Sequence, residues 1–258
     1  MPYADADGCA IHYTDPGDGD APLVVFLGEA GFGAWQWGWQ YGALGPYRAV
    51  VVDTRGSGRS DAPAGPSAMA DLVGDLEAVL ADCGVRKAHL VGCGLGGCVA
   101  LAAARRTTRA RSLTLIGTPA TGDDFEPADL AADPDDPEAL RASTTALLSD
   151  GFLAREDAPV EQIVEWRGEE DATPSARAAQ LAAIEEFDPG PLYELTLSAL
   201  VVAGGIDSVV AADSSEQLAE GLPNGEYRGF PDAGHLVTVE RSAALNDALA
   251  GVLDSVDE

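Results

Sequence analysis

A glycine-rich turn between an apolar strand and an alanine-rich helix is the stretch of this chain that most resembles a catalytic motif. The segment His89-Leu90-Val91-Gly92-Cys93-Gly94-Leu95-Gly96-Gly97-Cys98 predicts a strand, a sharp turn and then a helix. In the pattern G-x-S-x-G, small residues flank a strained turn that exposes the central side chain at a helix N-terminus. Gly92 and Gly96 are the small flanks here, but the central residue is Gly94, which has no side chain. The chain therefore has the frame of a nucleophile elbow without the nucleophile.

Strands and helices alternate on both sides of this turn. Apolar runs predict strands at 8–14, 22–27, 48–53, 112–117, 199–204 and 227–230. Helices are expected at 67–83, 99–105, 213–221 and 239–256, and the aromatic segment 34–41 predicts an irregular helix start. Such alternation implies right-handed crossovers and a mostly parallel central sheet with helices on both faces, which is the α/β class.

The stretch from about 121 to 191 differs in composition from the rest. It is acidic, contains prolines and predicts helices at 137–155, 159–166 and 175–187, with no strand-like run. We expect a helical cap, or lid, at residues 121–191, inserted into a core formed by residues 1–120 and 192–258. Caps of this kind shape pockets and exclude water.

Five motifs in order make the chain resemble the α/β-hydrolase fold superfamily over nearly its whole length. They are the glycine loop at 27–33, Asp53-Thr54-Arg55-Gly56-Ser57-Gly58-Arg59-Ser60, the turn at Gly94, Gly204-Gly205-Ile206-Asp207, and Pro231-Asp232-Ala233-Gly234-His235. The resemblance implies an α/β-hydrolase fold with an inserted helical cap.

By this resemblance, Asp207 matches the acid and His235 the base of a catalytic triad, in the family's chain order. A carboxylate that accepts from one ring nitrogen fixes the histidine tautomer and stabilises its protonated form. The other nitrogen is then free to take a proton. His12 and His89 have no such context. The resemblance thus implies a degenerate triad of acid and base.

The resemblance also gives Ala30 and Leu95 as the two backbone donors of an oxyanion hole. Gly28-Glu29 stands where the family usually carries His-Gly. A carboxylate there opposes a stabilisation in which removing one donor costs about 100-fold or more. Two interpretations stay open: Glu29 is buried with a raised pKa and acts as an acid, or it points outward to solvent or pairs with an arginine.

Gly94 excludes ordinary covalent catalysis at the elbow, because that needs a side-chain nucleophile. Cys93 is one residue off the apex, so its side chain should point elsewhere, and Cys98 lies about one helical turn further on. Both are expected to pack as small apolar residues. An off-register thiolate is the alternative.

The formal net charge of −28 argues against nucleic acid or an anionic membrane as a partner. Lys87 is the only lysine, whereas arginine supplies the other basic residues. This pattern favours a halophilic protein, because salt at 1 M screens charges within roughly 3 Å and relieves self-repulsion. The alternative is codon bias in a GC-rich genome.

The cysteines and the apolar runs predict the compartment and the cofactors. Four scattered cysteines without paired spacing are expected to be free thiols in a reducing cytoplasm. No apolar stretch is long enough to span a membrane, and the N-terminus lacks the features of a signal peptide. With no zinc-ligand spacing and no phosphate fingerprint in a suitable context, neither a metal nor an organic cofactor is expected.

Two functions remain. The first is a hydrolase-like enzyme, or a lyase or isomerase, that acts on a small organic substrate through Asp207 and His235, by water activation or proton transfer. The second is an inactive homologue that binds a small apolar ligand or a protein partner. Replacing Gly94 with serine tests whether the remaining machinery is intact.

Overall fold

The computed structural model describes residues 2–17 and 21–257, so the ends of the predicted core at 1 and 258 lie outside it. One eight-stranded sheet has the order β1-β2-β4-β3-β5-β6-β7-β8. The strands are β1 (Tyr3–Ala6), β2 (Cys9–Thr14), β3 (Leu23–Leu27), β4 (Arg48–Val52), β5 (Ala88–Cys93), β6 (Ala110–Ile116), β7 (Ala199–Gly204) and β8 (Gly225–Phe230). From β4 to β8 all neighbours are parallel, which confirms the predicted α/β class.

An antiparallel hairpin forms one edge of the sheet. β1 pairs with β2, which pairs antiparallel with β4. β1 was not predicted from the sequence, although Asp7 and Gly8 indicate its turn. Both have left-handed backbones, with φ of 54° and 87°, and Asp-Gly is a preferred pair in two-residue hairpin turns.

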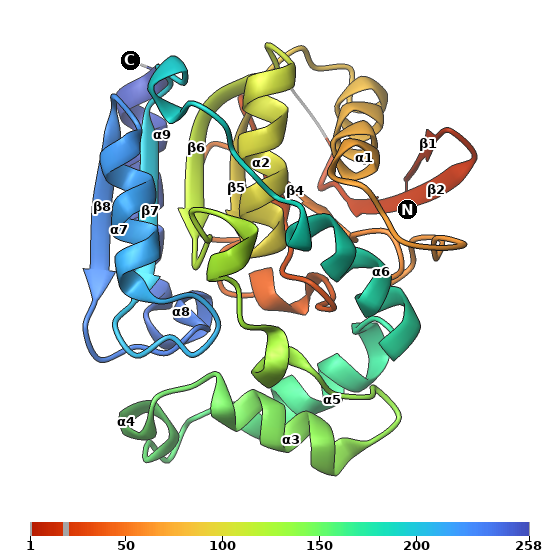
Figure 1. Ribbon diagram of the computed structural model, residues 1–258, viewed down its shortest axis with the longest axis vertical. Coiled ribbons are helices and arrows are strands. Elements are labelled where there is room, and N and C mark those ends of the chain that lie inside the picture. Colours follow the sequence, from red (N-terminus) through yellow and green to blue (C-terminus); the bar gives the residue numbers. More distant parts are fainter. Residues whose placement is uncertain (1, 18–20, 258) are drawn as a thin grey trace.

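Helices cover both faces of the sheet (Figure 1). They are α1 (Met69–Asp82), α2 (Leu95–Arg106), α7 (Ala212–Gly221), α8 (Val237–Glu240) and α9 (Ser242–Asp257). The prediction of a single helix at 239–256 is wrong, because α8 ends at Glu240 and α9 begins at Ser242, with Arg241 in a turn between them. Among the described residues no helix is both long and apolar enough to cross a membrane.

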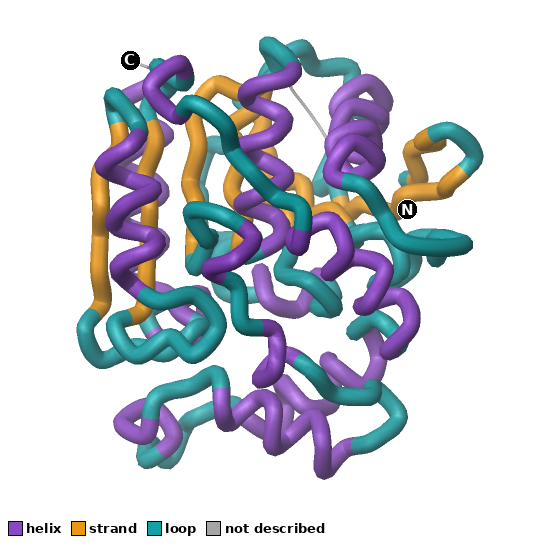
Figure 2. Tube along the Cα trace, in the orientation of Figure 1, coloured by secondary structure: helices purple, strands orange, loops and turns teal. Residues whose placement is uncertain are grey.

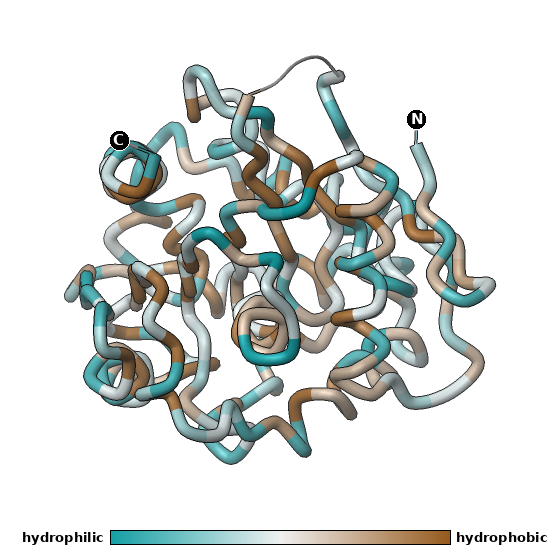
Figure 3. The backbone as a smooth tube through the Cα atoms, turned by 90° about the horizontal axis from the view of Figure 1, so that it is seen from above, coloured by the Kyte–Doolittle hydropathy of each residue, from teal (hydrophilic) through white to brown (hydrophobic). Residues whose placement is uncertain are grey.

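Alternation along the strands divides the apolar core between the two faces. In β3, Val25 and Leu27 join the cluster that contains the apolar residues of α1 and α2, whereas Val24 and Phe26 face the cluster that contains those of α9. Figure 3 shows apolar segments running mostly through the interior of the molecule. The buried sheet is thus a rigid base for the loops that leave its strands.

The chain between β6 and β7 is helical. It contains α3 (Pro137–Ala146), α4 (Asp150–Leu153), α5 (Val160–Glu170) and α6 (Pro174–Glu185). The helix predicted over 137–155 is interrupted at 147–149, where the Ser149 hydroxyl accepts from Phe152 N and caps α4. α3, α4 and α5 lie beyond the carboxyl ends of the strands (Figure 1), and the loops at those ends lie between them and the sheet (Figure 2).

The acidic composition leads to a prediction about salt. We expect the stability of the protein to rise from low salt to about 3 M KCl, because screening reduces the repulsion within a chain of net charge −28. Thermal unfolding followed by circular dichroism across this range measures the effect. Equal stability at all salt concentrations would favour codon bias as the origin of the composition.

Candidate active site

Four loops that leave the carboxyl ends of the central strands meet at one place. Glu29 follows β3, Gly94 follows β5, Asp207 follows β7 and His235 follows β8. In open α/β sheets this edge is where ligands bind. The structure brings all of these sequence-predicted residues together, with Ala30 and Leu95 beside them.

Asp207 and His235 form a buried pair. The His235 Nδ1 atom lies 2.9 Å from Asp207 Oδ2 and 3.1 Å from Oδ1, and neither side chain is exposed. Asp207 Oδ1 also accepts from the backbone N–H groups of Val209 and Val210, at 2.8 and 3.0 Å. These bonds hold the carboxylate, which in turn fixes the orientation of the imidazole.

Glu29 occupies the other side of the imidazole. Its Oε2 lies 3.0 Å from His235 Nε2. Its Oε1 accepts from Ala30 N at 2.5 Å and from Leu95 N at 3.1 Å. The interpretation in which Glu29 points to solvent or pairs with an arginine is wrong, because the residue is 0% exposed and its partner is His235. The Glu29 carboxylate therefore accepts from both predicted oxyanion-hole donors and also contacts His235.

The charge of His235 follows from these contacts. Burial opposes protonation, but Asp207, Cys93 and Glu29 outweigh it and raise the pKa of His235 well above its ordinary value. The protonated imidazole donates from both ring nitrogens, to Asp207 on one side and to Glu29 on the other. The site is therefore a buried row of three side chains in which His235 lies between Asp207 and Glu29.

Gly94 provides the space that Glu29 fills. A β-carbon built on Gly94 would stand 1.6 Å from Glu29 Oε2, so the two cannot coexist. Gly94 has φ +48° and ψ −110°, a strained turn immediately before α2. Close packing also requires glycine at Gly96, where a β-carbon would lie 2.0 Å from the Leu27 carbonyl oxygen. A carboxylate oxygen from a different loop therefore lies where a side chain at position 94 would begin.

Cys93 lies closer to the site than its register predicts. It is buried, and its Sγ lies within 4.8 Å of a carboxylate oxygen of Glu29 and a ring nitrogen of His235. These three atoms could surround one metal ion. Burial raises the pKa of the Cys93 thiol despite the opposing effect of His235. Metals bind the thiolate, and both Glu29 oxygens are already hydrogen-bonded. The group therefore fits a metal poorly, and the expectation of no metal stays a prediction.

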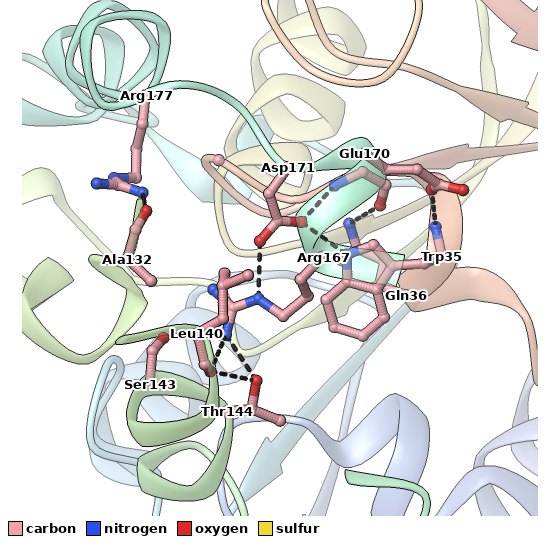
Figure 4. Close-up of polar contacts among 12 residues, drawn as sticks. Trp35, Gln36, Ala132, Leu140, Ser143, Thr144, Arg167, Glu170, Asp171 and Arg177 are labelled. Atoms are coloured by element: carbon pink, nitrogen blue, oxygen red, sulfur yellow. Dashed lines mark hydrogen bonds and ion pairs between the residues drawn. The ribbon is translucent and has the colours of Figure 1, made fainter. Parts of the chain in front are cut away.

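The helical segment between β6 and β7 forms hydrogen bonds with the stretch that follows Glu29. Trp35 donates from its backbone to Glu170 at 2.8 Å and from its indole to Asp171 at 2.7 Å (Figure 4). The buried Arg167 donates from Nε to Asp171 at 2.7 Å, and its Nη1 contacts Ser143 and Thr144 on α3. This network was not predicted from the sequence. Its only signal is the i, i+4 spacing of Arg167 and Asp171 in an acidic stretch.

Hydrogen bonds from backbone N–H groups connect the loops of Glu29 and His235 to the same segment. Gly31 N donates to Gln180 Oε1 at 2.6 Å. The buried Glu240 accepts at Oε1 from Gly234 N, beside His235, and from Ser149 N, at 2.8 and 3.0 Å. A surface pocket of about 510 Å³, lined by Trp39, Phe152, Arg155, Val239 and others, does not include Glu29 or His235. The side chains of Glu29 and His235 are both fully buried.

A second buried histidine–aspartate pair lies outside the site. His12 Nδ1 stands 2.8 Å from Asp53 Oδ2, between β2 and the loop after β4. His89 contacts Ser112 at 2.7 Å and Asp257 at 3.3 Å. Neither histidine contacts an oxyanion donor or Glu29 in these hydrogen bonds. What distinguishes His235 is therefore the combination of an acid on one nitrogen and Glu29 on the other.

The comparison with known proteins agrees with the fold. The sequence profile described as "Alpha/beta hydrolase family" matches residues 24–248. The chain belongs to this family. It is 30% identical over 262 residues to a 2-hydroxy-6-oxononadienedioate/2-hydroxy-6-oxononatrienedioate hydrolase of Paraburkholderia phymatum, covering 94% of this chain and 90% of the relative.

Two further likenesses concern lactonases. The chain is 26% identical to 3-oxoadipate enol-lactonase 1 of Acinetobacter baylyi, with 93% of this chain and 91% of that protein covered. The crystal structure of the enol-lactonase from Burkholderia xenovorans LB400 superposes with a TM-score of 0.86 at 27% identity, covering 98% of this chain and 100% of that one. The expected α/β-hydrolase fold is confirmed, and these relatives agree with a hydrolase-like enzyme.

Proposed function

We propose that this protein is an enzyme that acts on a small organic substrate through Asp207, His235 and Glu29, without a serine nucleophile. The observation that carries this proposal is the 3.0 Å contact between His235 Nε2 and Glu29 Oε2. It continues the buried Asp207–His235 pair into a third polar group that stands at the elbow apex. A protein that had only lost its nucleophile would have no need of this arrangement.

The roles follow from the geometry. Asp207 orients His235 and stabilises its protonated form, and His235 moves a proton to or from a water molecule or the substrate. The helical segment 121–191 acts as the cap, because it supports the loops of both Glu29 and His235 and must move to admit substrate. All four cysteines are free thiols, which is consistent with a cytoplasmic enzyme.

A screen with two histidine variants tests the proposal. Purified protein at high salt is assayed with ester, lactone, epoxide and alkyl halide substrates. We expect His235→Ala to lower turnover by roughly 10²–10⁴-fold, as loss of a general acid–base does. The matched control is His12→Ala, which removes an equally buried histidine with an aspartate partner. That variant should lose stability but keep its turnover per folded molecule.

The runner-up function is that of an inactive homologue that binds a small apolar ligand or a protein partner. It is favoured by one observation, namely that Glu29 is fully buried and already occupies both oxyanion donors. In that case the screen would give no turnover with either histidine variant or with the unchanged protein. A ligand-induced rise in melting temperature without turnover would then identify the binder.

A further inference from the structure

We propose that Glu29 is a covalent nucleophile that attacks saturated carbon, so that the substrate is an alkyl compound with an anionic leaving group, such as an alkyl halide. The inference rests on the proposed function and names its substrate class. It starts from the two different environments of the Glu29 oxygens. Oε1 accepts from Ala30 N and Leu95 N, whereas Oε2 forms its hydrogen bond with His235.

The position of Oε2 is that of an elbow nucleophile. It stands 1.6 Å from the place where the first side-chain atom of residue 94 would be. It therefore takes the place at the N-terminus of α2 that the elbow normally gives to its own central side chain. A carboxylate is a known nucleophile in enzymes that form ester intermediates. The nucleophile has thus moved from the elbow to the loop after β3.

The occupied oxyanion hole selects the kind of carbon attacked. Attack on an acyl carbon places negative charge on the substrate oxygen, which needs the two backbone donors in the transition state. In this protein Glu29 Oε1 holds both donors. Attack on a saturated carbon develops no substrate oxyanion, so that step loses nothing. Ala30 N and Leu95 N then stabilise the second step, hydrolysis of the ester, in which the oxyanion develops on Oε1 itself.

The two steps balance as follows. First, a lone pair of Oε2 forms a bond to the saturated carbon while the bond to the leaving group breaks, and the halide departs with the electron pair. Once Glu29 is esterified, His235 releases its resting proton to solvent. Water then attacks Cδ of the ester, and the neutral His235 takes one of its protons. The oxyanion on Oε1 is held by Ala30 N and Leu95 N. Its collapse releases the alkoxide with Oε2, and His235 returns the proton to it. Glu29 gives the remaining proton to His235, which restores the resting site.

Alkylation also changes the charge next to His235. In the resting site, Glu29 is one of the groups that favour protonated His235. The ester is neutral, so this contribution disappears while burial continues to disfavour the charged imidazole. Asp207 still fixes the ring through Nδ1. Formation of the intermediate therefore promotes the neutral form of His235 that the hydrolytic step requires as a base.

The test traps the intermediate by removing the base. The His235→Gln variant is incubated with 1-bromobutane and 1-bromohexane, digested, and analysed by mass spectrometry. We expect the peptide that contains Glu29 to gain one alkyl group, with hydrolysis of the ester slowed by roughly 10²–10⁴-fold. Hydroxylamine distinguishes this ester from thioethers formed on the half-buried Cys9 and Cys83. Because His235→Gln could fold poorly, Asp207→Asn is trapped in parallel.

Oxygen labelling gives a second measurement on the unchanged protein. In a single turnover with H₂¹⁸O, we expect the alcohol to carry unlabelled oxygen from Glu29 and Glu29 itself to gain ¹⁸O. Labelled alcohol in the first turnover, or ester turnover without any alkyl group on Glu29, would overturn the nucleophile while leaving the Asp207–His235 enzyme intact. Absence of reaction with every substrate class in the unchanged protein would overturn both. The Glu29→Gln variant should remain unalkylated at position 29.

Discussion

Gly94→Ser alone is expected to give no esterase activity, whereas Glu29→Gly combined with Gly94→Ser is expected to create it. In the single variant the new β-carbon would stand 1.6 Å from Glu29 Oε2, so the serine and the carboxylate compete for one place. Removing the carboxylate also frees Ala30 N and Leu95 N, which become available to a substrate oxyanion. Since one such donor is worth about 10²–10³-fold, the double variant should exceed either single variant by at least about 100-fold.

A matched glycine separates the clash from backbone strain. Gly45 has φ +58°, close to the +48° of Gly94, but nothing lies within 4 Å of its β-carbon position. Gly45→Ser therefore measures strain alone. We expect Gly94→Ser to lose about 1–3 kcal/mol more in thermal unfolding than Gly45→Ser, as overpacked sites do. If the single Gly94→Ser variant is as stable as the Gly45→Ser control and hydrolyses p-nitrophenyl acetate, Glu29 does not occupy the apex.

The order of motifs made the fold and the meeting point of the site predictable from sequence. Each motif is local, and parallel strands bring their carboxyl ends to one edge, so Asp207, His235 and Gly94 could be placed together. The site's central feature was not predictable in the same way. Whether Glu29 turns inward depends on the space left by a glycine 65 residues later, in another loop. The sequence did indicate it indirectly, because Gly94 lacks the side chain of the usual nucleophile and Glu29 follows a neighbouring strand of the sheet.

Other features were missed because weak local signals compete with tertiary packing. The break at 147–149 was hidden by continuous helical composition, although Ser149 is a good N-cap residue. Its backbone N–H also donates to Glu240 on the distant helix α8. The sequence around Arg167 does not single it out, yet this side chain is fully buried. It joins α5 to α3 through Ser143 and Thr144 and is paired with Asp171 at the end of its own helix. Such partners depend on contacts between helices, which periodicity does not specify.

The protein is expected to lose stability as the pH rises above neutrality, because folding raises the pKa of His235. In the unfolded chain this histidine releases its proton near pH 6.5, whereas the folded site retains it well above that value. The stabilisation is therefore complete below about pH 6.5 and is lost as the pH rises through the folded pKa. Between these two values one extra proton is bound by the native state, so the free energy of unfolding falls by about 1.4 kcal/mol per pH unit.

Variants at both ends of the Glu29–His235 contact identify the source of this loss. Chemical unfolding is measured between about pH 6 and pH 9.5, below the range in which tyrosines titrate. Their raised folded pKa values, as at Tyr47, would add a further alkaline loss. Glu29→Gln removes one of the groups that raise the pKa of His235, so the decline should end at lower pH. His235→Gln should lack this decline altogether. A slope in His235→Gln equal to that of the unchanged protein would mean that other groups set the alkaline limit, and that the imidazolium between Glu29 and Asp207 does not stabilise the fold.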